Sequence, residues 1–514
     1  MHSRTIPKVL SLVLAAGGGF FTDWAFPDHN LWFLAICGLA VLAVALLRDH
    51  AGWNFIIGWA WGIGFFLPHL QWAQYAVGGN LPWVVLSLVE ALFVGLFAVA
   101  WTFTRRITWV REKMWAGALT FAVLWVGVES LRSAVPWGGL PWGRIGFSQS
   151  DSPLVRIAWL VGVPGISFVV AALAFLLAGA LLGVLALNMW QAGLSSATLV
   201  AIIMATFAIP LNGQAEDGTL TVGAVQGNVA NPGRDAFMNQ REVLNNHVAG
   251  TLALADHPNA DTLDVVVWPE NGTDIDPQED ADARALIDDA AAKVGVPVLL
   301  GAQEYPRTGG RYNVSLLWQA GEGVLGRYAK QRPVPFAEYI PARDFFAKIY
   351  PGVDAISIDM IAGSEPAALA VPVPRLGRDV VVGPIICFEV AVDDVVHDSI
   401  DHGAQVLFVQ TNNASFGPTS ESTQQLAMSR IRAVETGRAV VHVSTVGVSA
   451  VYSPTGVEYD RTEHFEAAQM LETVSLRDSV TPSVAMGQWP TRAFWAGSVL
   501  LLVAGLFASR RSRA

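Results

Sequence analysis

The chain has 514 residues, of which 53% are hydrophobic and only 15% are charged, and its mean hydropathy is +0.42. Soluble globular proteins carry about 25% charged residues, so this composition excludes an ordinary soluble protein and predicts membrane-spanning segments. The formal net charge is −11. No basic surface is therefore expected, and nucleic acid is excluded as a partner.

Long apolar runs recur between residues 8 and 211 and once more near the end of the chain. A run of about 18 apolar residues is long enough to cross the hydrocarbon core of a bilayer. The first run has the charge pattern of a signal peptide but no convincing cleavage site, so it is interpreted as a retained span. The sequence predicts a multi-span α-helical membrane bundle of about eight transmembrane helices, near residues 8–22, 30–47, 53–71, 82–103, 114–131, 164–187, 194–211 and 490–508.

Charge divides the chain into three parts. Residues 213–486 hold 36 of the 43 acidic and 18 of the 32 basic side chains, whereas the remaining chain is net basic. We therefore expect a transmembrane bundle of about seven helices at residues 1–212 and a water-soluble domain at residues 213–486. A last transmembrane helix and a basic tail are expected at residues 487–514.

Basic residues near span ends predict the orientation, because Lys and Arg are retained on the cytoplasmic side. Most of them fall on one side of the predicted bundle: Arg4, Lys8, Arg48, Arg105, Arg106, Arg111, Lys113, Arg510, Arg511 and Arg513. The loop between spans 5 and 6 is a misfit, since Arg132, Arg144 and Arg156 would face outward. Both termini are expected in the cytoplasm of a bacterium, and the soluble domain outside it at the cell membrane.

The chain has two cysteines, Cys37 within predicted span 2 and Cys387 in the soluble domain. A domain with one cysteine forms no internal disulfide. Two interpretations of Cys387 stay open at this point: a buried residue that packs like a small hydrophobe, or a reactive thiol.

Short apolar, β-branched runs alternate with helical patterns in the soluble domain, which indicates an α/β layered fold. Thr419 is placed to cap the last helix and Gly437 to end it. Residues 344–363 are apolar and irregular, and we expect a loop that forms a lid, dips into the bilayer or packs beneath the domain. The predicted strands are 220–226, 263–267, 296–301, 314–318, 380–387, 405–409 and 440–444, and the predicted helices are 235–255, 280–294 and 419–437.

Reactive side chains lie at the ends of predicted strands or in the loops after them: Glu270, Lys330, Glu338, Cys387 and Glu389. Each alone has a structural interpretation, as a capping acid, a solvated charge or a partner in an ion pair. Together, a carboxylate, an ammonium group and a thiol are the groups that amide or ester chemistry requires. The carboxylate takes the thiol proton, the thiolate attacks a carbonyl, and the cation stabilises the oxyanion.

The motifs Trp268-Pro269-Glu270, Lys330 and Cys387-Phe388-Glu389 resemble the Glu-Lys-Cys triad of the nitrilase, or carbon–nitrogen hydrolase, superfamily. That resemblance implies an αββα sandwich. The position of the domain before one last span is similar to that in the apolipoprotein N-acyltransferase family. The resemblance covers essentially the whole chain. Further matches support the narrower family: Val225-Gln226-Gly227-Asn228, Val334-Pro335-Phe336-Ala337-Glu338-Tyr339-Ile340-Pro341 and Glu129-Ser130-Leu131-Arg132.

The resemblance implies a role for each matched residue. Glu270 would be the general base, Lys330 would stabilise the tetrahedral intermediate, and Cys387 would carry the acyl group as a thioester. Glu338 would be a second acid that positions the site, and Glu389 would support Lys330 or a nearby loop. The backbone N–H of Phe388 would be a further oxyanion donor, by the general logic of nucleophile turns.

One segment departs from the family pattern. The family often has an acidic residue and a tryptophan where this chain has Asn413 and Ser415. An aromatic wall of the acyl pocket would then be missing or supplied by another segment, which affects the preferred acyl chain rather than the triad.

The resemblance also implies the substrates. A membrane phospholipid would donate an acyl chain to Cys387, and diacylglyceryl apolipoproteins would accept it at the α-amine of their N-terminal cysteine. No cofactor is implied, and the 10 histidines show no metal-ligand spacing, so no metal is expected. A monomer is expected.

Three other functions compete with this interpretation. A membrane-anchored amidase would use the same triad with water as the acceptor. A transporter is disfavoured because the predicted spans hold almost no paired charges. A catalytically inactive nitrilase-like module is disfavoured because Glu270, Lys330 and Cys387 are all present.

Overall fold

The computed structural model describes residues 6–76, 78–229 and 241–511. The chain forms two compact units. The helical unit comprises Met1–Gln74, Gly79–Pro210 and Met486–Ala514, and the α/β unit comprises Tyr75–Gly78 and Leu211–Ala485.

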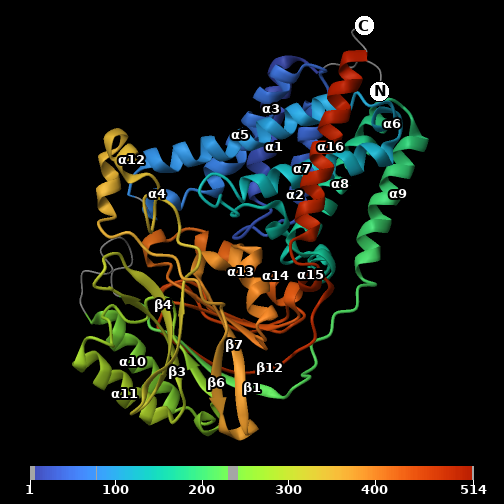
Figure 1. The fold of residues 1–514 in the computed structure, drawn as a ribbon. Coiled ribbons are helices and arrows are strands. Elements are labelled where there is room, and N and C mark those ends of the chain that lie inside the picture. The colour runs from blue at the N-terminus through green and yellow to red at the C-terminus, as the bar shows by residue number, and fades with distance from the viewer. Residues whose placement is uncertain (1–5, 77, 230–240, 512–514) are drawn as a thin grey trace. The chain divides into compact units, whose positions relative to one another are not determined.

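A helix lies at each of the eight positions where a span is predicted (Figure 1). By length and hydropathy, five described helices are able to cross a membrane, namely α5, α7, α8, α9 and α16, and α2 is apolar but shorter. The number of spans therefore stays a prediction. The helices of this unit are α1 (Lys8–Asp23), α2 (Phe33–Ala45), α3 (Ala51–His69), α5 (Asn80–Thr104), α6 (Thr108–Glu112), α7 (Met114–Arg132), α8 (Ile157–Leu185), α9 (Met189–Thr206) and α16 (Trp489–Arg511). Two short helices lie where the chain passes from one unit to the other: α4 (Ala73–Ala76) and α15 (Pro482–Met486).

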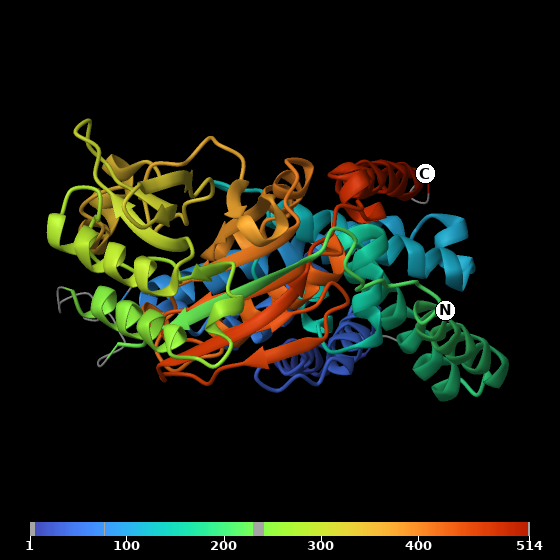
Figure 2. The same cartoon turned by 90° about the horizontal axis from the view of Figure 1, so that it is seen from below.

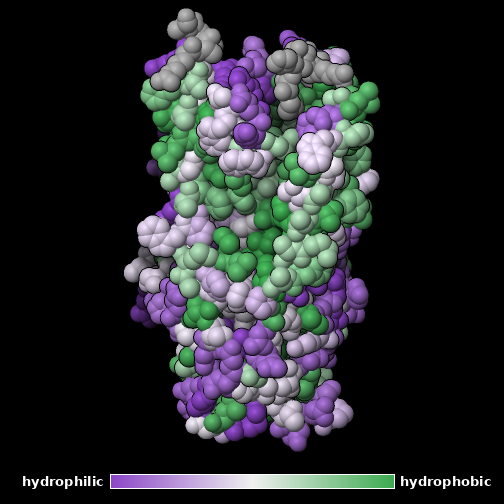
Figure 3. All heavy atoms as spheres, turned by 90° about the vertical axis from the view of Figure 1, so that its right-hand side faces the viewer, coloured by the Kyte–Doolittle hydropathy of each residue, from purple (hydrophilic) through white to green (hydrophobic). Residues whose placement is uncertain are grey.

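The outer surface of the helical unit is apolar. Figure 3 shows hydrophobic residues gathered along the helices on one side of this unit. On α9 and α16 the exposed side chains include Leu194, Val200, Met204, Val499, Leu500, Val503 and Phe507. Apolar surface of this extent is unfavourable in water and is typical of helices that face lipid.

The interior of the helical unit holds a buried ion pair. Arg132 Nη1 donates to Glu90 Oε2 at 2.8 Å, and it also donates to the carbonyls of Leu140 and Trp142 at 2.8 Å. Glu129 accepts the backbone N–H of Ile145 at 2.7 Å. The end of α7 thereby holds the irregular segment after it, through bonds from Arg132 to two of its carbonyls and from one of its backbone N–H groups to Glu129.

The α/β unit contains two six-stranded sheets, which the predicted sandwich requires. The first has the order β12-β1-β2-β3-β4-β5 and the second the order β11-β10-β9-β8-β7-β6. Strands β1, β2 and β3 run parallel, as do β7, β8 and β9. The strands are β1 (Thr219–Gln226), β2 (Val265–Val267), β3 (Val298–Glu304), β4 (Tyr312–Gln319), β5 (Gly323–Ala329), β6 (Leu369–Val373), β7 (Arg378–Ile386), β8 (Val406–Thr411), β9 (Ala439–Ser444), β10 (Ala450–Tyr452), β11 (Glu458–Arg461) and β12 (Ala468–Ser475).

Helices cover the outer faces of both sheets, with α10 and α11 on one side and α13 and α14 on the other (Figure 1). Figure 2 shows β1 beside β12, so the first and last strands of this unit pair with each other. The predicted αββα architecture is confirmed. The helices are α10 (Glu242–Ala255), α11 (Ala281–Val294), α12 (Arg343–Ile349), α13 (Asp393–Asp401) and α14 (Glu421–Thr436).

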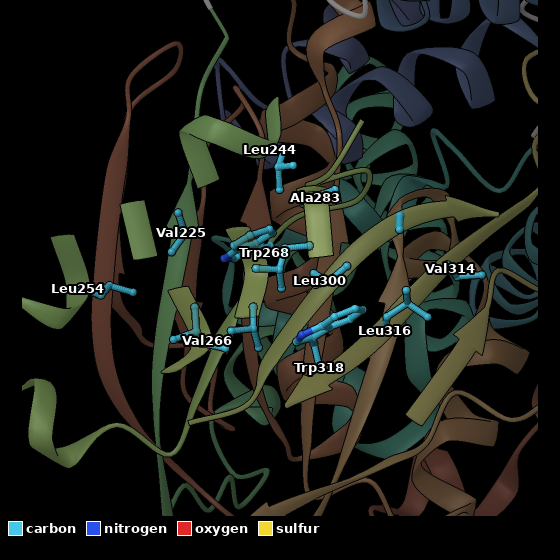
Figure 4. Packing of buried hydrophobic residues seen from close by; sticks show 14 of the residues in the cluster. Val225, Leu244, Leu254, Val266, Trp268, Ala283, Leu300, Val314, Leu316 and Trp318 are labelled. Atoms are coloured by element: carbon cyan, nitrogen blue, oxygen red, sulfur yellow. The ribbon is translucent and has the colours of Figure 1, made fainter. Parts of the chain in front are cut away.

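The core of the first layer lies between the first sheet and α10 and α11 (Figure 4). Two buried indoles tie these helices to the sheet. Trp268 Nε1 donates to Thr251 Oγ1 of α10, and Trp318 Nε1 donates to Asp288 Oδ1 of α11, both at 2.8 Å. Because Trp268 directly follows β2, this packing fixes the backbone just before residue 270.

Several predicted elements differ in the structure. The start predicted for the helix at 235–255 lies outside the described residues, and α10 begins at Glu242. Thr419 does not cap α14, because the helix begins at Glu421 after Ser420 and the Thr419 hydroxyl donates to the carbonyl of Phe416. Residues 344–363 are not a plain loop, since they include most of α12 and a 3₁₀ turn at Pro351–Ala355.

Candidate active site

Glu270 lies just beyond β2 and is buried at 4% exposure. Pro269 removes a backbone donor and ends the strand. The carboxylate of Glu270 is held by two donors: Asn313 Nδ2 binds Oε1 at 2.6 Å, and the backbone N–H of Asn412 binds Oε2 at 3.0 Å. These bonds leave the carboxylate fixed in direction between the two sheets.

Lys330 follows β5, and its side chain is 1% exposed. Its Nζ lies 2.6 Å from Glu338 Oε1 and 3.4 Å from Glu270 Oε1. Burial alone would lower the pKa of Lys330, but the carboxylates of Glu338 and Glu270 raise that pKa above its usual value. The residue is therefore a fixed ammonium ion between two acids.

Cys387 begins a 3₁₀ turn directly after β7. Its φ is +53°, a left-handed conformation that non-glycine residues rarely adopt. The residue is partly exposed, whereas Phe388 after it is buried. Burial and the charge of Glu270 raise the pKa of the Cys387 thiol, and the charge of Lys330 lowers it. A neighbouring base is consequently needed to form the thiolate.

Glu338 lies in the loop after Lys330, and this carboxylate has a second partner. Its Oε2 accepts the backbone N–H of Val334 at 2.7 Å while Oε1 contacts Lys330. Phe336 between them has a φ of +62°. The proline-containing loop is thus folded around the acid that pairs with the ammonium group.

Glu389 lies in the turn of Cys387 but points to the loop of Lys330. Its Oε1 accepts the backbone N–H groups of Gln331 and Arg332 at 2.6 and 3.1 Å, and its Oε2 accepts that of Ile386 at 2.9 Å. The Tyr328 hydroxyl also donates to it at 2.9 Å. Burial raises the pKa of Glu389 to about 7 despite these donors.

All five candidate residues are therefore close together in the structure. Sequence reasoning did not identify several polar residues around them: Asn313, Tyr328, Gln410, Asn412, Glu421 and Gln425. The signal for Asn313 and Gln410 was polarity within a buried strand, because such a side chain needs a partner.

Gln410 joins the two sheets beneath this site. Its Nε2 donates to the carbonyl of Trp268 at 2.7 Å, and its Oε1 accepts the Ser315 hydroxyl at 2.6 Å. Strand β8 is thereby tied to β2 and β4 at the end where Glu270 and Asn412 lie.

Asn413 and Ser415, the positions that depart from the family pattern, have different environments. Asn413 is buried, and its Nδ2 donates to Glu421 Oε2 at 2.7 Å. Burial raises the pKa of Glu421 to about 8. Ser415 is partly exposed in the 3₁₀ turn Ala414–Phe416.

In the part of the chain that the structure describes, no group of three or more His, Cys, Asp and Glu side chains is placed to hold a metal ion. The carboxylates near Cys387 are instead bonded to Lys330 and to amide groups.

Comparison with known proteins identifies the family. Residues 18–176 match the family model "Apolipoprotein N-acyltransferase N-terminal domain", and residues 221–471 match "Carbon-nitrogen hydrolase". An apolipoprotein N-acyltransferase of Mycolicibacterium smegmatis is 36% identical over 99% of this chain and 88% of its own length. The chain belongs to the apolipoprotein N-acyltransferase family. It is a membrane enzyme within the carbon–nitrogen hydrolase superfamily.

Other members of the apolipoprotein N-acyltransferase family are similarly related along the whole chain. That of Ralstonia nicotianae is 31% identical over 98% of this chain and 94% of its own length. Among solved structures, an amidase from Nesterenkonia sp. covers 55% of this chain and 99% of its own, at 16% identity and a TM-score of 0.39.

Proposed function

We propose that this protein moves an acyl chain from a membrane phospholipid, through a thioester on Cys387, to the α-amine of the N-terminal diacylglyceryl-cysteine of apolipoproteins. The observation that carries the proposal is the convergence of Glu270, Lys330 and Cys387 in a chain of this family. Lys330 Nζ contacts Glu270 at 3.4 Å, and both residues interact electrostatically with the Cys387 thiol.

In the first half-reaction, Glu270 takes the proton from Cys387 Sγ, and the thiolate attacks the ester carbonyl of the phospholipid. The Lys330 ammonium group, and the backbone N–H of Phe388, stabilise the oxyanion of the tetrahedral intermediate. The ester C–O bond then breaks, and Glu270 gives its proton to the leaving alcohol oxygen. Lysophospholipid departs and the acyl group stays on sulfur.

In the second half-reaction, the α-amine of the acceptor attacks the thioester carbonyl. Glu270 takes a proton from the amine as the C–N bond forms, and the thiolate leaves and regains that proton. The result is an amide and a free thiol, which is ping-pong chemistry on one nucleophile.

Glu338 and Glu389 act as positioning residues in this scheme. Glu338 contacts the ammonium group of Lys330 directly, whereas Glu389 binds the backbone of the loop that follows it. Contacts with Glu338 and Glu270 keep the ammonium group charged and fixed in position, as stabilisation of the oxyanion requires.

The orientation in the membrane is part of the proposal: both termini cytoplasmic and residues 213–486 outside. Impermeant maleimide labelling in a background of Cys37→Ser and Cys387→Ser tests this. Glu322→Cys in the α/β unit should be labelled in intact cells, and Glu112→Cys at the end of α6 only after permeabilisation; both side chains are exposed. The reverse pattern would contradict the orientation. We also propose a monomer, which light scattering of the detergent-solubilised protein tests.

The alternative is a membrane-anchored amidase that releases the acyl group to water. A transfer assay with labelled phospholipid and a diacylglyceryl-cysteine peptide separates the two. Label in the peptide, lost with Cys387→Ala and with an N-acetylated peptide, supports the acyltransferase. Label that appears only as free fatty acid would favour the hydrolase.

A further inference from the structure

Cys387 Sγ has a hydrogen-bond partner outside the triad. Gln425, on the first turns of α14, has its Nε2 at 3.5 Å from Cys387 Sγ. Gln425 is fully buried, so its amide groups are shielded from competing water. An N–H bonded to a sulfur atom stabilises the thiolate more than the thiol, because a hydrogen bond to a charged acceptor is stronger.

A chain of hydrogen bonds determines which end of the Gln425 amide faces the sulfur. It begins at the backbone N–H of Gly447, which can only donate, and which binds Ser444 Oγ at 2.8 Å. The Ser444 hydroxyl keeps its own proton, which it donates to Asn413 Oδ1 at 2.5 Å. With its oxygen committed, Asn413 turns its Nδ2 toward Gln425 Oε1, at 3.0 Å.

Two further bonds agree with this direction. Asn413 Nδ2 also donates to Glu421 Oε2 at 2.7 Å, and the Thr411 hydroxyl donates to Gln425 Oε1 at 2.6 Å. A reversed Gln425 amide would place two N–H donors, its own and that of Asn413, against each other. The network thus leaves Nε2 as the end of Gln425 that faces Cys387.

We infer that Gln425 is a further catalytic residue, which stabilises the Cys387 thiolate by donating an N–H to Sγ, with Ser444, Asn413 and Thr411 as positioning residues. The bond is made to thiolate formed by Glu270 and again to the thiolate that leaves when the thioester is broken. No proton passes through the amide. The inference rests on the proposed role of Cys387 as nucleophile.

The need for such a donor follows from the surroundings of the sulfur. Burial and the nearby carboxylates oppose the thiolate, and Lys330, which favours it, is shared with Glu338 and Glu270. A neutral donor at 3.5 Å favours the negative sulfur without adding another charge to the site.

The test is the rate of iodoacetamide alkylation of Cys387 as a function of pH, measured on the detergent-purified full chain by peptide mass spectrometry, which separates Cys387 from Cys37. Gln425→Met keeps the volume and removes the donor. We expect the apparent pKa of alkylation to rise by about one unit, so that the rate at pH 7 falls about tenfold. Ser444→Ala, which releases only the first side chain of the network, should lower the rate in the same direction by less.

Gln424→Met is the matched control, because Gln424 is also buried on α14 but donates to Ser420 Oγ. Its alkylation profile should equal that of the wild type. The inference would be overturned if Gln425→Met and Ser444→Ala both had the wild-type alkylation profile. It would also be overturned if Gln424→Met lowered the alkylation rate as much as Gln425→Met does. If Gln425→Met does not fold, the Ser444→Ala profile decides. Alkylation needs no lipid, so this result is independent of whether the acyl transfer proposed above occurs.

Discussion

The backbone N–H of Gln331 donates a hydrogen bond of 2.6 Å to the carboxyl group of Glu389. These residues follow strands of different sheets: Gln331 comes after Lys330 beyond the end of β5, and Glu389 comes after Cys387 beyond the end of β7. One carboxyl group therefore sets the separation between the proposed oxyanion stabiliser and the proposed nucleophile.

Replacing Glu389 by Gln tests this link. An amide cannot accept all the N–H groups that now converge on the carboxyl group, so at least one buried donor loses its partner, at a cost of about 1–3 kcal/mol. We expect acyl-enzyme formation to fall by about ten- to a hundredfold, because the Lys330 loop shifts relative to Cys387. Tyr328→Phe is the control, since it removes one donor and leaves the backbone link intact. Equal losses in both variants would argue against a role for the loop tie.

Glu270→Gln should abolish proton transfer while keeping the fold. The amide introduced by this substitution retains an acceptor oxygen for Asn313 or Asn412 but cannot take the Cys387 proton. Single-turnover acylation should slow by about a hundred- to ten-thousandfold, the usual contribution of a general base. The control variant Glu279→Gln changes an exposed side chain in the loop after Glu270, and it should become acylated at the wild-type rate. An active Glu270→Gln variant would remove Glu270 from the mechanism.

Glu421→Gln should make stability less dependent on pH. The folded-state pKa of Glu421 is raised by burial from its ordinary value of 4.5 to about 8. An acid whose pKa is raised on folding contributes stability that is present below its unfolded pKa and lost as the pH rises through the folded pKa. The free energy of unfolding of the wild type should therefore fall by on the order of 3 kcal/mol between about pH 5 and pH 8 because of this group. The variant should not show this fall. Thermal unfolding in detergent at both pH values measures the difference, and parallel pH profiles would contradict it.

Gln410→Leu should weaken the packing of the two sheets. It leaves the carbonyl of Trp268 and the hydroxyl of Ser315 buried without this partner, which costs about 2–4 kcal/mol. Gln319→Leu, at the partly exposed end of β4, should change the free energy of unfolding by less than about 0.5 kcal/mol. Urea unfolding monitored by tryptophan fluorescence would show the contrast, and similar midpoints for the two variants would contradict it.

The positions of Glu270 and Cys387 could be predicted because each follows a strand that is visible as an apolar run. Lys330 was instead identified by the resemblance of its loop to the family motif, because β5 before it contains two glycines and an arginine and gives no apolar run. The parallel strands β1, β2, β7 and β8 bring their carboxyl ends to the same edge of the sandwich, so side chains distant in sequence meet there. Strand β11 was missed because its residues Glu458 to Arg461 are mostly exposed and charged, which gives no apolar run.

The partners of the triad could not be predicted in the same way. Asn313 of β4 cannot be matched to Glu270 from the sequence, because their contact exists only in the folded protein. The start of α14 was misjudged because Thr419, Ser420 and Glu421 are all compatible with a helix N-terminus, and contacts of the folded state decide among them. Gln425 gives no sequence signal at all, since a glutamine in a helix is commonly a surface residue.

Intact-protein mass spectrometry of the purified enzyme after incubation with phospholipid tests the central claim most directly. The account predicts a fatty-acyl mass increment on the wild type that is absent from Cys387→Ala and is removed by hydroxylamine and by a diacylglyceryl-cysteine peptide. No increment on the wild type, or the same increment on Cys387→Ala, would contradict a thioester on Cys387.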